Sequence, residues 1–193
     1  MSKVVNNPFL LGLQGMFGNA MVVKKVRGKY QLANRPSPSR SRTTSAEQEA
    51  VKAKFLKATK YAKVHAKRAE EGKPTEYTEG ITANKHSVYL VAMSDKLNPP
   101  VIESVEAPDY TGAVGEAIEI IATDDFKVTG VKVIITDGND AQLESGEAVQ
   151  EDEESPDTWT YKTTSANSNV DGTVITAIAR DKAKNKTTFE KEI

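Results

Sequence analysis

The chain has 193 residues, 27% of them charged, a formal net charge of −1 and no cysteine. This length suits one ordinary domain with an extension, or two small domains. The lack of cysteine excludes disulfides, thiolate catalysis and cysteine-ligated zinc, and a total of two histidines argues against histidine metal sites and Ser-His-Asp triads. No apolar run is long enough for a membrane-spanning helix. We therefore expect no enzymatic activity, no cofactor and no small-molecule substrate.

The charges are divided between two halves of the chain. Residues 1–98 carry 18 Lys and Arg against 7 Asp and Glu, whereas residues 99–193 carry 8 against 20. This asymmetry indicates nucleic-acid contact, attraction between the two halves, or head-to-tail association of neighbouring copies. Asn98-Pro99-Pro100 marks the boundary, because proline disfavours helix there. We divide the chain into an arm, hairpin and linker (1–45), a basic helical segment (46–98) and a β-sandwich (99–193).

The first 20 residues are apolar but broken by glycines, and they form the expected arm. Polar residues and a proline interrupt the apolar run, which argues against a signal peptide. We expect cytoplasmic synthesis, with a virion or another particle as the final location. Five large apolar side chains of the arm are candidates for self-association: Phe9, Leu10, Leu11, Leu13 and Phe17.

Residues 21–26 and 29–33 are two β-prone runs around Gly28, a pattern that predicts a hairpin. An isolated hairpin is marginally stable in water, so it needs another surface on this chain or on a neighbour. Residues 34–45 are rich in Ser, Pro and Arg and are interpreted as an extended linker.

Residues 46–71 predict a long amphipathic helix, preceded by a capping box at 44–47 and ended by Gly72 and Pro74. Its narrow apolar stripe suits close packing against one partner. The stripe includes His65, interpreted as an interface residue, and four candidates for self-association: Val51, Phe55, Ala58 and Ala62. Basic residues of the hairpin and the helix are candidates for anion binding: Lys24, Lys25, Arg27, Lys52, Lys57, Lys60, Lys63 and Lys67. Residues 87–97 fit a strand or a second short helix, and the spacing of Ala92, Met93 and Leu97 favours the helix.

From residue 99 onward, apolar and polar residues alternate with period two. Strands are predicted at 101–105, 117–122, 131–135, 159–163, 174–179 and 187–193. Regular short strands with turn signals are typical of a β-sandwich, with Trp159 between the sheets. The fold class is therefore mainly β, with a β-sandwich preceded by an arm, a hairpin and a basic amphipathic helix.

The C-terminal half resembles bacterial immunoglobulin-like domains. The resemblance is carried by Pro99 to Ile102, the turn at Gly115, Thr123 to Val128, Trp159 to Tyr161 and Ala179 to Asn185. The last motif usually reads A-x-D-x-A-G-N in that family, and here Lys184 replaces the glycine. The resemblance implies a packing or recognition module without catalytic residues. The N-terminal half resembles small uncharacterised Bacteroidetes and phage-associated proteins through its glycine-rich hairpin (15–30), proline segment and helix (44–69).

Three aspartates, Asp124, Asp125 and Asp181, are candidate calcium ligands, because they are expected near one end of the sandwich and supply the oxygen atoms that Ca²⁺ prefers. The alternative interpretation is that these side chains cap turns by accepting hydrogen bonds from backbone amides. The acidic run 151–154 is interpreted as a solvated loop, or as a receptor for the basic helix of a neighbour.

Together these patterns favour a non-enzymatic structural protein that assembles into a homo-oligomer or polymer through its arm and helix, for example as a phage-type virion component. The first alternative is a nucleic-acid-binding protein that uses its basic half. The second alternative is an exported Ig-like surface adhesin.

Overall fold

The computed structural model describes residues 2–4, 15–17, 20–26, 29–35, 44–151 and 155–193. They belong to two compact units, Met1–Ser45 and Ala46–Ile193. The helical segment and the following strands therefore form one unit, and the N-terminal strands form another.

The N-terminal unit is a four-stranded antiparallel sheet. Its strands are β1 (Ser2–Val4), β2 (Gly15–Phe17), β3 (Met21–Val26) and β4 (Lys29–Asn34), in the order β1-β4-β3-β2. The predicted hairpin is confirmed as β3 and β4, which pair from Met21↔Asn34 to Val26↔Lys29. The expectation of a plain arm over 1–20 is wrong for 2–4 and 15–17, because these segments flank the hairpin as edge strands. They add the extra pairing that an isolated hairpin lacks.

The helical segment begins with α1 (Ala46–Glu70), followed by the one-turn 3-10 helix η2 (Glu76–Thr78) and α2 (Val88–Leu97). The second helix is confirmed, and Ser87 caps it by accepting a hydrogen bond from the Leu90 amide at 3.3 Å. Ala62 of α1, Tyr77 of η2 and three residues of α2 form a small core. The alanines allow close approach of the two helices. None of the helices in the described ranges is long and apolar enough to cross a membrane.

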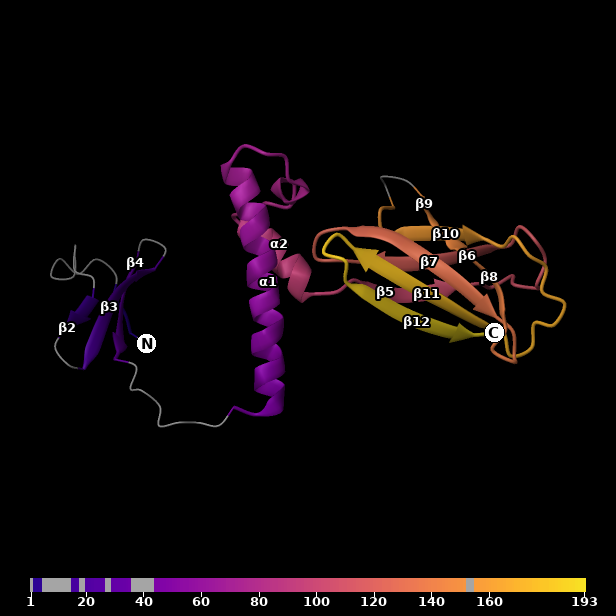
Figure 1. Cartoon of the computed structure of the whole chain (residues 1–193), viewed down its shortest axis with the longest axis horizontal. Coiled ribbons are helices and arrows are strands. Elements are labelled where there is room, and N and C mark those ends of the chain that lie inside the picture. Colours follow the sequence, from indigo (N-terminus) through magenta and orange to yellow (C-terminus); the bar gives the residue numbers. More distant parts are fainter. Residues whose placement is uncertain (1, 5–14, 18–19, 27–28, 36–43, 152–154) are drawn as a thin grey trace. The chain divides into compact units, whose positions relative to one another are not determined.

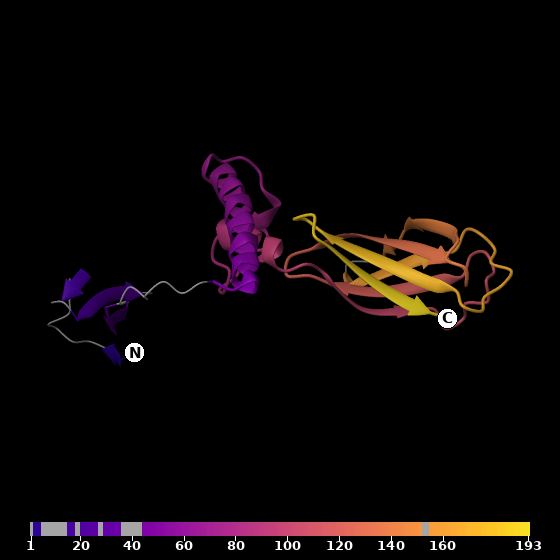
Figure 2. The same ribbon diagram turned by 60° about the horizontal axis from the view of Figure 1, so that its bottom comes forward.

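The C-terminal strands form two packed four-stranded sheets, which Figures 1 and 2 show as two layers. One sheet has the order β5-β6-β10-β9 and the other β12-β11-β7-β8. The strands are β5 (Val101–Glu106), β6 (Ala117–Thr123), β7 (Val128–Thr136), β8 (Gln142–Glu147), β9 (Val149–Gln150), β10 (Thr158–Lys162), β11 (Val174–Asp181) and β12 (Lys186–Glu192). The predicted β-sandwich is confirmed.

Alternation along the strands places the core between the two sheets. In β11, for example, Ile175, Ala177 and Ala179 are buried while the residues between them are partly exposed. Trp159 belongs to this core, as predicted. Strands β8 and β9 were not expected, because neither segment alternates clearly. The inward-facing residue of β8 is a glutamate, Glu144, which is 8% exposed.

Candidate functional site

Three buried or half-buried aspartates meet where the helical segment joins the sandwich. Asp95 lies in α2, Asp124 directly follows β6, and Asp181 ends β11. Each offers a carboxylate oxygen, and the three oxygens lie within 4.8 Å of one another. Asp95 is completely buried and Asp181 is 3% exposed. We call these residues the aspartate cluster.

Two members of the cluster also hold turns of the sandwich. One oxygen of Asp124, Oδ2, accepts hydrogen bonds from the backbone amides of Phe126 and Lys127 at 3.0 and 3.1 Å. The Asp181 carboxylate accepts hydrogen bonds from the backbone amide and the side-chain amide of Asn185, both at 2.6 Å. Asp124 and Asp181 therefore cap turns, as the alternative interpretation predicts. Their carboxylates also lie close together in the cluster.

Asp95 receives its hydrogen bond from a buried tyrosine. The Tyr77 hydroxyl donates to Asp95 Oδ2, and the Tyr61 and Tyr77 hydroxyl oxygens lie 2.8 Å apart. Burial, together with the nearby Asp181 and Asp124 carboxyls, raises the pKa of the Asp95 carboxyl to about 7, against the opposing hydrogen bond from Tyr77. Burial also raises the pKa of the Asp181 carboxyl, against the hydrogen bonds from Asn185. The site thus resists carrying three negative charges.

Asp125, the other aspartate proposed from the sequence, is not part of the cluster. Its carboxylate accepts hydrogen bonds from Ser94 and from the Asn98 side chain, the latter at 2.7 Å. It also pairs with Lys85 at 3.2 Å. Burial alone would raise the pKa of the Asp125 carboxyl, but these donors outweigh it and lower the pKa. Asp125 therefore fastens α2 and the preceding loop to the sandwich.

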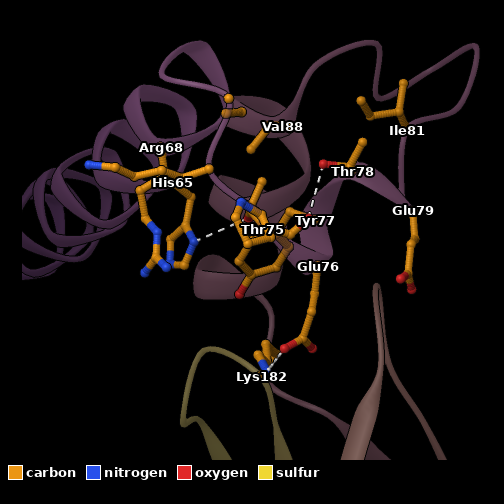
Figure 3. Close-up of a pocket in the computed structure, with 14 residues that line it drawn as sticks. His65, Arg68, Thr75, Glu76, Tyr77, Thr78, Glu79, Ile81, Val88 and Lys182 are labelled. Carbon is orange, nitrogen blue, oxygen red and sulfur yellow. Dashed lines mark hydrogen bonds and ion pairs between the residues drawn. The ribbon is translucent and has the colours of Figure 1, made fainter.

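An open pocket of about 890 Å³ is lined by Tyr77 and the rest of η2, by the end of α1 and by Lys182. Figure 3 shows Glu76 reaching toward Lys182, with which it forms an ion pair. The His65 and Tyr77 rings meet edge to face with centroids 4.8 Å apart. Burial lowers the pKa of His65, and the cations Arg68 and Lys182 lower it further. His65 therefore packs as a neutral interface residue, in line with its interpretation from the sequence.

The apolar stripe of α1 is covered along only part of its length. Ala58 and Ala62 are completely buried against the helical core, whereas Val51 is 67% and Phe55 50% exposed. All four lie on one face at helical spacing. Figure 1 shows the first turns of α1 extending past α2. No described element of the 46–193 unit covers this first half of the stripe.

The other candidate residues are distributed over both units. Phe9, Leu10, Leu11, Leu13 and Arg27 lie outside the described residues, and Phe17 is described only as part of the β2 backbone. Lys24 and Lys25 are both exposed in β3. The proposed anion-binding lysines of α1 are all exposed: Lys52, Lys57, Lys60, Lys63 and Lys67.

Asp95 is the member of the cluster that sequence reasoning missed. A signal was present, because Val88, Val91, Ala92 and Asp95 follow the spacing of one helical face. An acid on the apolar face of a helix needs a partner for its charge. Nothing in the local sequence indicates, however, that this partner region lies in the turns after β6 and β11.

The sequence matches no known protein family and no curated protein. Among solved structures, the chain is similar to CopC from Methylosinus trichosporium OB3b, with 13% sequence identity and a TM-score of 0.36. The similarity covers 47% of this chain and 87% of CopC. The strand pairing itself defines the class: a mainly β protein with a β-sandwich and a helical N-terminal addition.

Proposed function

We propose that this protein is a non-enzymatic assembly protein that associates with further copies of itself through the first half of α1. The observation that carries the proposal is the half-covered stripe of that helix. Val51 and Phe55 continue the face that Ala58 and Ala62 bury, yet they remain at least 50% exposed. Apolar residues aligned on one unpartnered helical face are typical of a protein interface.

Charge supports a second copy as the occupant of this face. Helix α1 carries seven Lys and Arg against three Glu, whereas residues 99–193 carry 8 basic against 20 acidic residues. The helix of one copy and the sandwich of another are therefore complementary in charge, which favours an oriented encounter. Because the two surfaces differ, the contact would be head-to-tail and would build a ring or a filament.

A groove in the sandwich offers apolar and acidic groups for such a helix. It has a volume of about 620 Å³ and lies beside β8 and β9, the last strands of their respective sheets. Glu147, Val149 and Glu151 line it together with residues of β10, among them Lys162. Val149 is 71% exposed. The acidic run 151–154 begins at the same place in the sequence.

The test is the mass of the full chain measured by light scattering after size exclusion, on nuclease-treated protein. At about 50 mM salt we expect an oligomer or polymer, and at about 1 M salt, where the Debye length is roughly 3 Å, we expect it to dissociate. A monomer under both conditions contradicts the proposal. Negative-stain imaging separates a closed ring from an open filament.

A matched pair of variants tests the face itself. Val51→Glu places a charge in the proposed contact, whereas Val64→Glu makes the same change on another face of the helix, where Val64 is 59% exposed. We expect Val51→Glu to weaken association about tenfold or more, and Val64→Glu to leave it unchanged. Glu151→Lys should weaken association in the same way as Val51→Glu. Equal effects of the two valine substitutions would contradict the assignment of the face.

In its finer form, the proposal identifies the sandwich as a bacterial Ig-like module and the assembly as a phage-type particle. Support for the module comes from the motif at 179–185, in which Lys184 adopts a left-handed backbone conformation with φ of 64°, the conformation that suits the glycine of the family motif. A particle with regular symmetry in the negative-stain images would support the virion role, and amorphous aggregates would contradict it.

Nucleic-acid binding is the second candidate function, and the exposed lysines of α1 favour it. They would neutralise phosphates without reading base sequence, so binding should fall steeply with salt. A gel shift with double-stranded DNA at about 50 mM salt tests this function. If the gel shift persisted in Val51→Glu and were lost when Lys57 and Lys60 are replaced with Gln, that result would assign nucleic-acid binding, and not self-association, to α1.

A further inference from the structure

The aspartate cluster contains oxygen atoms that lack any partner. Asp95 Oδ1 and Asp124 Oδ1 are buried and accept no hydrogen bond, although the second oxygen of each carboxylate is well satisfied. Buried polar atoms in folded proteins are nearly always paired, and leaving one unpaired is unfavourable. The Asp95 and Asp124 carboxyls lie within hydrogen-bond reach of each other, and carboxylate oxygens of all three aspartates lie within 4.8 Å. A positive charge at this place, either a cation or a shared proton, would satisfy both oxygens.

The described side chains do not supply that positive group. No Lys or Arg in the described ranges forms an ion pair with Asp95, Asp124 or Asp181. The Lys96 ammonium lies near the aspartate cluster, but it donates hydrogen bonds elsewhere, to the carbonyl of Ala183 at 2.6 Å and to Asn185 Oδ1 at 3.3 Å. Three carboxylates in a buried site, without a paired cation, are strongly unfavourable when ionised.

We propose that Asp95, Asp124 and Asp181 bind one Ca²⁺ ion that links α2 to the two turns of the sandwich. The donor set consists of carboxylate oxygens, which hard divalent cations prefer over the soft or imidazole sites of transition metals. Ca²⁺ fits such a set better than Mg²⁺, because it tolerates irregular geometry and gives up its water more readily. The ion would neutralise two of the three charges and occupy both unpartnered oxygens.

This ion would have a structural effect. Its ligands come from α2, from the end of β6 and from the end of β11, so binding would strengthen the contact between helical segment and sandwich. Stability should therefore rise with Ca²⁺ concentration, because the ion binds the folded chain and not the unfolded one. The inference does not depend on self-association, and Val51→Glu should bind Ca²⁺ as the native chain does.

The experiment is a titration of the chelator-treated full chain with CaCl₂, followed by calorimetry and by thermal unfolding. We expect one saturable site per chain, a midpoint of unfolding that rises with Ca²⁺, and a weaker response to MgCl₂. Absence of both heat and thermal shift at Ca²⁺ concentrations up to about 10 mM, beyond the weak end of protein calcium sites, overturns the proposal. The unpartnered oxygens of Asp95 and Asp124 would then share a proton.

Three variants make the test specific. Asp95→Asn and Asp124→Asn each remove one ligand charge while keeping the shape of the side chain, and each should weaken Ca²⁺ binding at least about tenfold. Asp125→Asn is the matched control, because Asp125 adjoins Asp124 in sequence but contacts Lys85, Ser94 and Asn98. If Asp125→Asn weakened Ca²⁺ binding as much as Asp124→Asn does, the attraction would be nonspecific. That result would overturn the site. Should Asp95→Asn fail to fold, Asp124→Asn retains the Tyr77–Asp95 hydrogen bond and decides the question.

Discussion

The side-chain amide of Asn185 donates a hydrogen bond to the backbone carbonyl of Asp95 at 2.9 Å, across 90 positions of the sequence. The same amide donates to the Asp181 carboxylate at 2.6 Å. One side chain in the β11–β12 turn therefore joins α2, the turn and the aspartate cluster. The turn therefore helps to hold α2 against the sandwich. Lys184 lies next to Asn185 in this turn.

Replacing Lys184 with glycine should stabilise the protein by up to about 1 kcal/mol. Lys184 has a φ of 64°, and a left-handed conformation costs a residue with a Cβ about 1–2 kcal/mol, which exceeds the entropy that glycine loses on folding. Asp140→Gly is the comparison, because Asp140 has a φ of 61° and aspartate tolerates this region better. Urea unfolding should show the larger gain for Lys184→Gly, and a loss of stability would contradict the turn geometry.

His65 should make stability depend on pH below about 6.5. Its pKa in the folded chain is lowered by burial, then by Arg68 and Lys182, so the unfolded chain takes up the proton first as pH falls. The stabilising contribution of the neutral ring is present above pH 6.5 and is lost as pH falls through the folded pKa. His65→Gln should therefore show a smaller decrease in urea midpoint between pH 7 and pH 5. His86→Gln, at an exposed position, is the control, and equal slopes for the two variants would contradict this role.

Asp125→Ala should destabilise the helical segment by about 1 kcal/mol, a value reduced for the exposure of this carboxylate. The substitution removes the acceptor for Ser94 and Asn98 and the ion pair with Lys85. Cleavage by trypsin after Lys85 should become faster, because the loop before α2 loses its attachment to the sandwich. Asp109→Ala, another exposed aspartate, should change neither property. An unchanged cleavage rate in Asp125→Ala would contradict the proposed attachment.

Glu144→Ala should destabilise the sandwich by about 3 kcal/mol. Glu144 Oε2 accepts hydrogen bonds from the Tyr161 hydroxyl at 3.0 Å and from the Thr164 amide at 2.7 Å, with two further donors from Thr164 and Ser165. Removing a buried charged acceptor leaves these donors unsatisfied. Glu144→Gln keeps one acceptor and should cost less. Glu147→Ala, on the same strand but exposed, should change urea stability by less than about 0.5 kcal/mol.

Secondary structure can be predicted from the residues alone wherever one periodicity is unbroken. The spacing of 46–71 predicted α1, the alternation after residue 99 predicted the strands with clear apolar faces, and glycine at 28 marked the hairpin. These are local properties, because the periodicity of a helix or strand sets the face on which each of its residues lies. Strand β9 has only two residues, both exposed. Strand β8 escapes prediction because its buried position is occupied by Glu144, whose partners lie 17 to 21 residues away.

Which acidic residues meet depends on how the folded chain packs. Asp124 and Asp125 are neighbours in the chain with the same side chain, yet one faces the cluster and the other faces Lys85. Their different directions follow from the turn after β6, in which Asp124 caps two backbone amides. Asp95 lies on the buried face of α2, which packs against α1 and Tyr77, and Asn185 of the turn after β11 binds its backbone carbonyl. Distances between segments so far apart in sequence depend on the packing of whole elements, and no local pattern of residues records them.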